Sequence, residues 1–458
     1  MKKDRFYRNS DLRINKYFAQ VQFKSRLERA KRHGKEVFYN EVRILNNCYY
    51  ARKLQGDISI KDIFQIYWKD FKKKYYAQLK RPNLIDSIET MISCHNFNNG
   101  YLYYECPNCK NFYMIGFSCK SRFCQSCGQK YKKARTEKIS EKCLKMPHRQ
   151  FVFTIPCDLR IYFRKDHRLL DLLFKSASEA LVSCLKKSAP IAYVKEHRQL
   201  GYIMFLHTFG RDLKWHPHLH ILLAERYISN DGSIHKFNYF HFDYLRKTFQ
   251  NKLFHNIYLF YKTIIRNNFL TNKMLKLLNY LKNKYPDGYY VYGPKFDDSN
   301  TTTSDMKKLT SYICRYASHP PISERRILSI NKNSNQISWF YDPHEDDDIK
   351  DEEQKIGRQF ITEHVFEFMK KLIIHIPDKG FQIIRYYGFY SNKFKFKHLF
   401  SNNKLFSNAS LKKMLDNIKW INGLLDSFGY NPLLCSCGSH MYLNPEFCFY
   451  PRGPNNEI

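Results

Sequence analysis

The stretch HTFGRDLKWHPHLH (207–220) decides the fold, because it joins two apolar runs through a polar break that contains a glycine. The first run is GYIMFLHTF (201–209) and the second is LHILLA (219–224). Two apolar runs separated by such a break predict a β-hairpin. We expect its turn near Asp212 and Leu213.

The histidines of this hairpin fall on one face. Residues two apart in a strand project from the same side, about 6 to 7 Å from each other, so His218 and His220 lie side by side. His207 then lies beside them on the first strand. Two His-x-His pairs overlap here, whereas 18 histidines in 458 residues would give about 0.7 by chance. The pattern predicts a site of three imidazoles for a metal ion; the alternative is a structural cluster held by hydrogen bonds.

His216 is the fourth histidine of the stretch and the least favoured ligand. It precedes Pro217 and falls at the entrance of the second strand.

The composition favours a polyanionic partner. The chain has 77 Lys and Arg against 42 Asp and Glu, a formal charge of +35, and such an excess points first to nucleic acid. No apolar run approaches the ~18 residues that span a bilayer, and the N-terminus lacks an apolar secretory core. We therefore expect a cytoplasmic protein without membrane contact, in which the 14 cysteines are thiols or metal ligands.

The segment CPNCKNFYMIGFSCKSRFCQSC (106–127) contains two C-x2-C pairs. Such pairs bind one tetrahedral zinc ion from two tight turns, in a closed structural site. We expect this set from Cys106, Cys109, Cys124 and Cys127. Cys94, His95 and Cys119 offer a second or alternative set, and the spacing leaves open which four bind. Buried thiols without a metal are the alternative.

Basic residues follow the cysteines and suit a phosphate backbone. The predicted DNA-binding residues are Lys110, Lys120, Arg122, Lys130, Lys132, Lys133 and Arg315. Near the C-terminus, Cys435, Cys437 and His440 form C-x-C-x2-H, which is half a metal site at best.

Helical and strand periodicities alternate along the chain and predict an α+β fold on an antiparallel sheet. We expect two helices within 61–93, a strand at 150–155, and helices at about 166–187, 242–282, 305–318 and 361–374. The predicted domains are a basic N-terminal extension (1–60), a zinc-binding DNA-contacting domain (61–149), a catalytic domain (150–325), its C-terminal β/α extension (326–400) and a basic tail (401–458).

The stretch TSYICRYASH (310–319) places Tyr312 and Tyr316 four residues apart. On a helix, both phenols then lie on one face, about 5 to 6 Å apart. Two other pairs have this spacing, but proline or glycine between their members disfavours a helix: Tyr285 with Tyr289, and Tyr386 with Tyr390. Tyr316 also continues an apolar stripe, so a core role is the alternative.

Together these motifs resemble the HUH endonuclease superfamily, and specifically the two-tyrosine rolling-circle transposases of bacterial insertion sequences that carry an N-terminal transposase zinc-binding domain. The resemblance runs from about residue 61 to about 390. Its segments, in order, are SCKSRFCQSC, FVFTIP, the histidine hairpin, SYICRYASH and KGFQIIRYYG. It implies an HUH-type central antiparallel sheet flanked by helices, preceded by a small helical and zinc-ribbon-like domain.

The resemblance also implies residue roles. His218 and His220 would be the histidine pair of the superfamily, with His207 as our choice for the third ligand of a catalytic Mg²⁺ or Mn²⁺, although three imidazoles suit zinc-like metals better. Tyr312 and Tyr316 would be the nucleophiles, and Zn²⁺ would be structural. The partner would be single-stranded DNA at the ends of the insertion sequence and at its target, in the bacterial nucleoid.

Three other classes of protein remain open. One is a non-catalytic zinc-ribbon DNA-binding protein, another is a relaxase or replication-initiator nuclease of the same superfamily, and a third is a histidine-metal hydrolase that uses water. The sequence also departs from the family pattern, because Gln125 stands where proline is usual and the tail has C-x-C instead of C-x2-C.

Overall fold

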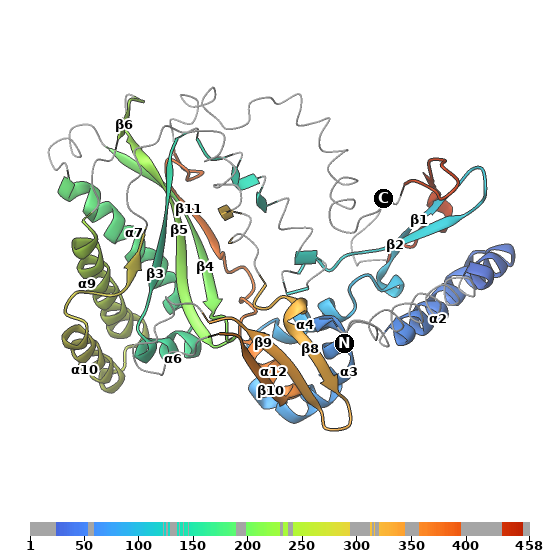
Figure 1. Cartoon of the computed structure of the whole chain (residues 1–458), viewed down its shortest axis with the longest axis horizontal. Helices are drawn as coiled ribbons and strands as arrows, with labels where there is room; N and C mark the ends of the chain where they lie inside the picture. The colour runs from blue at the N-terminus through green and yellow to red at the C-terminus, as the bar shows by residue number, and fades with distance from the viewer. Residues whose placement is uncertain are drawn as a thin grey trace.

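The computed structural model of this 458-residue chain describes most of the sequence (Figure 1). The described residues are 24–53, 59–121, 123–124, 127–128, 135–136, 138–140, 142–144, 146–188, 198–229, 232–236, 241–293, 312–313, 316, 320–343, 357–394 and 433–451. The fold is a mixture of helices and antiparallel sheets, which confirms the predicted α+β class.

Among the described residues, the largest sheet has six strands, all paired antiparallel. Its order is β11 (Ile384–Gly388), β4 (Gln199–Phe209), β5 (Trp215–Ile228), β3 (His148–Thr154) and β7 (Val291–Tyr292), with β6 (Ile234–Lys236) paired to the far end of β5. The predicted hairpin is therefore the centre of the sheet.

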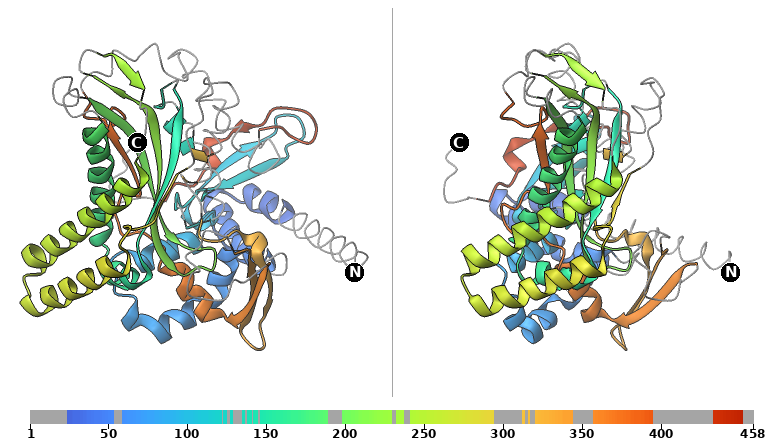
Figure 2. Two further views of the ribbon diagram at one scale, coloured as in Figure 1. Left: turned by 60° about the vertical axis from the view of Figure 1, so that its left-hand side comes forward. Right: turned by 90° about the vertical axis from the view of Figure 1, so that its left-hand side faces the viewer.

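One face of this sheet is covered by helices (Figures 1 and 2). Alternate side chains such as Met204, Ile221 and Phe153 pack against them in one large core. The helices are α6 (Cys157–Lys165), α7 (Leu169–Ser188), α9 (Phe242–Phe260) and α10 (Asn268–Lys284). The predicted helix over 242–282 is thus two helices, because the π-turn Tyr261–Ile265 and Arg266, with φ of 52°, break it.

The opposite face has its own smaller core. Ile203, Phe205 and Leu222 alternate with the residues of the first core and pack with Tyr312 and Ile313. The hairpin histidines belong to this face, because His207 and His220 are in step with Phe205 and Leu222.

A second unit combines N-terminal helices with a C-terminal sheet. The two predicted helices are α3 (Ile60–Tyr75) and α4 (Leu84–Ile92), and they share one core with the strands β8 (Ile327–Asn331), β9 (Gln336–Tyr341) and β10 (Gln359–His364) and with α12 (Val365–Ile373). The helix predicted over 361–374 begins later than expected. Its first residues pair with β9, and the side chain of His364 caps the helix by accepting from the Phe366 N–H.

A third unit is the sheet β12-β1-β2, formed by Tyr442–Leu443, Tyr101–Glu105 and Phe112–Gly116. Helical residues 24–32 and α2 (Lys35–Lys53) pack on it through side chains that include Leu27 and Phe38. Residues 24–53, which lie within the predicted basic N-terminal extension, are thus largely helical, because their apolar stripe has a sheet to cover. Short 3-10 turns are Tyr76–Gln78, Phe97–Asn99, Glu324–Arg326 and Pro445–Phe447.

Residues 61–149 contribute to three separate cores. β12, from the C-terminal region, pairs with β1. The predicted domain bounds stay a prediction. Most of the helix predicted near 305–318, the acidic run 344–353 and much of the tail lie outside the described residues. No helix in the described ranges combines the length and the apolar character that crossing a membrane requires.

Candidate active site and metal clusters

The turn at 210–214 sets the register of the histidine hairpin. Leu213 is buried with a φ of 63°, and the Lys214 N–H donates to the Asp212 carboxylate at 3.0 Å. The chain thereby reverses where the sequence predicts. His207 on β4 faces His218 on β5, and Phe205 faces His220.

This register brings the imidazoles of His207, His218 and His220 together, with one ring nitrogen of each within 4.8 Å of the others. The Nε2 atoms of His218 and His220 are 3.1 Å apart. Nitrogen ligands about 2.1 Å from one ion lie roughly 3 Å from each other, so this spacing fits a shared metal ion.

The surroundings of His218 keep it in the form that binds metal. Its Nδ1–H donates to the carbonyl of His216 at 2.8 Å, which leaves the lone pair on Nε2. Burial lowers the pKa of His218 to about 4, so the ring is neutral at pH 7. His216 is not part of the group of three, and burial lowers its pKa to about 2.

The two tyrosines predicted as nucleophiles lie against this cluster. The ring of Tyr316 stacks on His220, with centroids 3.8 Å apart, and is 5.5 Å from the ring of His207. The Nε2–H of His207 donates to the Tyr316 carbonyl at 3.1 Å. Tyr312 lies behind, with its ring 4.5 Å from Tyr316 and only 4% of its surface exposed. All three described residues of this segment, 312, 313 and 316, are helical.

A hollow opens beside the histidines. His207 and Tyr316 line one end of it, and most of the remaining wall is apolar or aromatic, including Phe209 and Trp215.

Three of the rings that line the hollow form a stack. Trp215 lies between His167, at 5.3 Å, and His375, at 5.9 Å, and all three rings are nearly parallel. His375 also fixes the hairpin, because its two nitrogens contact the carbonyl of Leu213 and the hydroxyl of Thr208.

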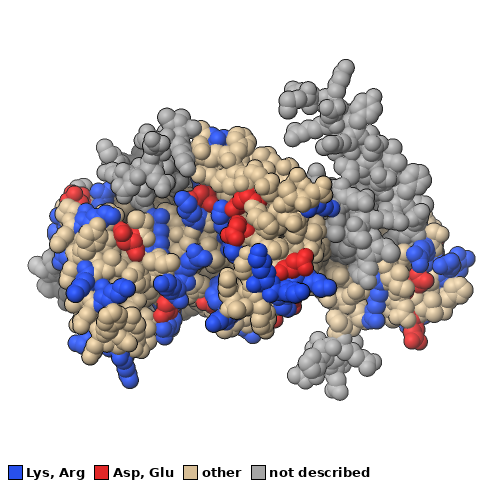
Figure 3. All heavy atoms as spheres, turned by 90° about the horizontal axis from the view of Figure 1, so that it is seen from below, with Lys and Arg blue, Asp and Glu red and all other residues tan. Residues whose placement is uncertain are grey.

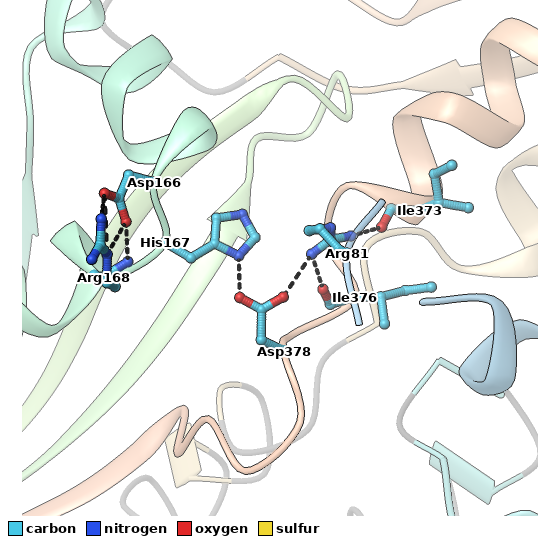
Figure 4. A network of polar contacts seen from close by, with 7 residues as sticks. All are labelled: Arg81, Asp166, His167, Arg168, Ile373, Ile376 and Asp378. Atoms are coloured by element: carbon cyan, nitrogen blue, oxygen red, sulfur yellow. Dashed lines mark hydrogen bonds and ion pairs between the residues drawn. The ribbon is translucent and has the colours of Figure 1, made fainter. Parts of the chain in front are cut away.

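A polar network supports the stack from outside (Figure 4). Asp378 accepts from His167 Nδ1 at 2.8 Å and contacts Arg81 at 3.4 Å. Arg81 also donates to the carbonyls of Ile373 and Ile376, both at 2.7 Å. The sequence analysis missed these residues, because they are isolated along the chain and only tertiary folding brings them together.

Within the part of the chain that the structure describes, two groups of four cysteines could also hold a metal ion. The first is Cys94, Cys119, Cys124 and Cys127. The sulfur–sulfur distance is 3.5 Å for Cys94–Cys127 and for Cys119–Cys127. Zn–S bonds of about 2.3 Å place tetrahedral sulfurs roughly 3.8 Å apart, so zinc fits here.

His95 supports this first cluster without being one of the four. Its hydrogen bonds to the thiols of Cys127 and Cys94 raise the pKa of His95 to about 10, and its Nδ1–H donates to the Gly116 carbonyl at 2.8 Å. A cationic ring balances thiolate charge. Gly116 permits the close approach, since a Cβ there would lie 2.4 Å from the His95 carbonyl oxygen.

The second group corrects the expected pairing of the two C-x2-C motifs. Cys106 and Cys109 do not join Cys124 and Cys127, because β1 and β2 carry the two motifs to different places. They lie instead with Cys435 and Cys437. His440 is not in the group; its backbone bridges Leu434.

Of the predicted DNA-binding residues, Lys110 and Lys120 are described, and both are exposed in left-handed turns with φ of 56° and 54°. The remaining five, Arg122, Lys130, Lys132, Lys133 and Arg315, lie outside the described residues. Figure 3 shows Lys and Arg side chains spread over the lower face, with acidic side chains between them.

Comparison with known proteins gives two family matches. Residues 63–155 match the family described as "Transposase zinc-binding domain", and residues 201–397 match the one described as "Putative transposase". The two ranges contain the first cysteine cluster and the histidine hairpin with both tyrosines.

Two curated relatives are similar over most of their length. The transposase for insertion sequence element IS801 of Pseudomonas savastanoi pv. phaseolicola is 24% identical over 320 residues, which is 68% of this chain and 70% of the relative. The "Putative transposase y4qJ" of Sinorhizobium fredii is 24% identical over 356 residues, 73% of this chain and 81% of the relative. No solved structure matches the chain.

Proposed function

Because the chain belongs to the insertion-sequence transposases that carry an N-terminal transposase zinc-binding domain, we propose that it cuts and rejoins single-stranded DNA through a covalent phosphotyrosine. The reaction would move the insertion sequence by a rolling-circle route in the bacterial cytoplasm. The observation that carries this proposal is the stack of Tyr316 on His220, 3.8 Å between rings, at the edge of the three-imidazole cluster.

His207, His218 and His220 would hold the catalytic divalent ion. When bound, such an ion neutralises the charge that develops on the scissile phosphate. Three imidazole ligands suit the softer divalent metals, and within the family pattern we expect Mg²⁺ or Mn²⁺ to serve. The hydrogen bond from His218 to the His216 carbonyl orients one of these rings, which favours a fixed ligand geometry.

The phenol oxygen of a tyrosine attacks the phosphorus and displaces the 3′ oxygen of the preceding nucleotide. The phenol loses its proton, the leaving oxygen gains one, and the 5′ phosphate becomes linked to the tyrosine. Since one phosphodiester replaces another, a 3′ hydroxyl can later reverse the step and join strands without an energy source. A second tyrosine permits another cut while the first is occupied.

We assign the first attack to Tyr316 and the second to Tyr312. The ring of Tyr316 contacts His220 directly and is partly exposed, whereas Tyr312 is buried behind it against Phe205. A small rotation of this segment after the first cut would bring the second phenol forward.

A single-stranded substrate agrees with the hollow beside the cluster. Bases of a duplex are stacked and paired, whereas those of a single strand can turn outward onto aromatic side chains. Phe209 lines a space next to His207 in which the base adjoining the scissile phosphate could lie. The formal charge of +35 favours the phosphates.

The test uses single-stranded oligonucleotides that cover the ends of the DNA element encoding the chain, labelled at the 5′ or the 3′ end, with Mg²⁺ or Mn²⁺. We expect the 3′-labelled fragment to migrate with denatured protein and the 5′-labelled fragment to be free. The Tyr312→Phe/Tyr316→Phe variant should form no adduct. The matched control is Tyr285→Phe/Tyr289→Phe, a pair with the same spacing away from the histidines.

Three other results would reject the proposal. An adduct in the Tyr312→Phe/Tyr316→Phe variant would mean that another residue is the nucleophile. Cleavage without any adduct would indicate a hydrolase that uses water, and binding without cleavage would indicate a DNA-binding protein.

A further inference from the structure

The C-terminal segment 433–451 lies on the N-terminal sheet, as the red segment beside β1 and β2 in Figure 1 shows. β12 pairs with β1, with Leu443 opposite Tyr104. Beyond it, Tyr101 and Phe449 exchange two backbone hydrogen bonds of 2.9 and 3.0 Å. The segment is therefore an edge strand of a domain whose other strands lie more than 300 residues earlier in the chain.

Four thiols meet where this segment crosses the β1–β2 turn. The sulfurs of Cys106 and Cys437 are 3.5 Å apart, and so are those of Cys109 and Cys435. Disulfide sulfurs would be about 2.05 Å apart, and the four cysteines are free. All four sulfurs lie within 4.8 Å of one another, close to the roughly 3.8 Å edge of a tetrahedral zinc–sulfur site.

The backbone around the thiols forms two facing turns. On one side, the Cys106 N–H donates to the Asn111 carbonyl at 2.7 Å; on the other, the Cys435 N–H donates to the Ser439 carbonyl at 2.9 Å. The side chain of Asn108 donates to the Ser439 hydroxyl at 2.6 Å and joins the turns. Each turn thus presents two thiols to the same point, as the knuckles of a zinc ribbon do.

We propose that Cys106, Cys109, Cys435 and Cys437 bind a second structural zinc ion that fastens the C-terminal segment to the N-terminal sheet. The zinc-binding domain is then assembled from both ends of the chain. The shorter C-x-C spacing is compensated by Gly438, whose φ of +85° closes the second turn. This site is separate from the histidine cluster and does not depend on the proposed DNA chemistry.

The test is the zinc content of the purified full-length chain, measured by mass spectrometry of the metal. The reference protein and every variant carry His207→Ala, His218→Ala and His220→Ala, so that only zinc at the cysteine sites is counted. We expect two zinc ions per chain in the reference protein and one in Cys435→Ser/Cys437→Ser. Cys106→Ser/Cys109→Ser should also retain one. The combination of all four substitutions should still retain one, because both pairs serve the same ion. When cobalt replaces zinc, each of these variants should show about half the thiolate-to-metal absorption of the cobalt-substituted protein that has both cysteine sites.

Cys448→Ser is the matched control, since Cys448 lies in the same segment and is buried but is outside the four. It should keep two ions. The remaining ion in the double variants shows that the first cysteine cluster is still folded. One ion in the reference protein, two in Cys435→Ser/Cys437→Ser, or none in either double variant would overturn the proposal.

Discussion

Individual ring contacts give the two tyrosines different positions at the histidine cluster. The ring of Tyr316 contacts His220, whereas the ring of Tyr312 contacts that of Tyr316. If this difference sets the order of attack, Tyr316→Phe should lower formation of the first adduct by at least about 10³-fold, as expected for loss of a nucleophile. Tyr312→Phe should leave the first adduct within a few fold and prevent the second cut.

The measurement is adduct formation in a single turnover, followed by strand joining when a 3′-hydroxyl acceptor is added. Tyr386→Phe is a suitable control, because Tyr386 lies at the same core as Tyr312 but not beside the histidines. Equal loss of the first adduct in Tyr312→Phe and Tyr316→Phe would contradict the proposal that Tyr316 attacks before Tyr312.

Single buried histidines also make stability depend on pH. Burial lowers the pKa of His148 to about 4, and its Nε2 lies 2.6 Å from the hydroxyl of Tyr390. In the unfolded chain the pKa is about 6.5. Between these values the unfolded state binds a proton that the folded state does not, so stability falls as pH drops from about 6.5 to about 4.

His148→Gln should remove this dependence. The free energy of unfolding of the wild type should fall between pH 7 and pH 5 by on the order of 2 kcal/mol more than that of the variant. Urea unfolding at both pH values measures the difference. The same fall in both proteins would show that His148 does not titrate as its burial implies.

At the scale of elements, local patterns predicted the parts of the site that neighbours in sequence determine. The period of two and the glycine-containing break specified β4, β5 and the facing positions of His207 and His218. Local patterns could not predict which cysteine pairs share one metal site. Cys109 meets Cys435 across 326 positions of sequence, and spacing motifs carry no information on which distant pair closes a site.

The same limit explains the other differences from expectation. Residues 359–364 have apolar positions that suit a helix or a strand, and pairing with β9 decides for a strand. The sequence placed α2 in a basic extension without a partner, because the sheet that it covers follows about 50 residues later and is completed by β12.

The hairpin turn tests whether backbone strain or burial dominates at Leu213. A non-glycine residue with a φ of 63° costs about 1 to 2 kcal/mol, whereas removing a buried leucine side chain costs about 2 to 5 kcal/mol. Leu213→Ala should therefore destabilise by the full burial cost. Leu213→Gly loses the same contacts but relieves the strain, so it should be the less destabilised of the two by about 1 kcal/mol.

Thermal and urea unfolding of the two variants provide the comparison. Leu206→Ala, at a buried position of β4 with ordinary backbone, controls for leucine removal alone. A glycine variant that is clearly less stable than the alanine variant would show that the turn stores no relievable strain.

At the scale of the whole molecule, the network around Arg81 ties together segments that are distant in sequence (Figure 4). Arg81 precedes α4, His167 precedes α7, and Asp378 follows α12. The guanidinium holds two carbonyls at the end of α12 and the Asp378 carboxylate. The planar guanidinium has several N–H donors in fixed directions and can make these contacts simultaneously, whereas the ammonium group of a lysine cannot.

Arg81→Met should thus destabilise the chain by roughly 2 to 3 kcal/mol, because it leaves partly buried acceptors without their donor. Arg81→Lys should recover less than half of that loss. Arg385→Met, at an exposed ion pair with Asp171, should change stability by less than about 1 kcal/mol. Full recovery by lysine would mean that only the charge of Arg81 matters.

The charge of the whole chain predicts how DNA binding responds to salt. Each phosphate contact on a single strand contributes about 0.7 to the slope of log affinity against log salt, because it releases counterions. Lys110 and Lys120 are exposed on the turns beside the two cysteine clusters. If both contact phosphates, Lys110→Ala/Lys120→Ala should reduce the slope by about 1.4 and weaken binding similarly for unrelated sequences.

The control Lys273→Ala/Lys276→Ala removes two exposed charges from α10 on the far side of the central sheet. Fluorescence anisotropy at roughly 50 to 300 mM salt measures these slopes. Equal slopes in the two variants would mean that the total charge, and not the turns that carry Lys110 and Lys120, determines binding.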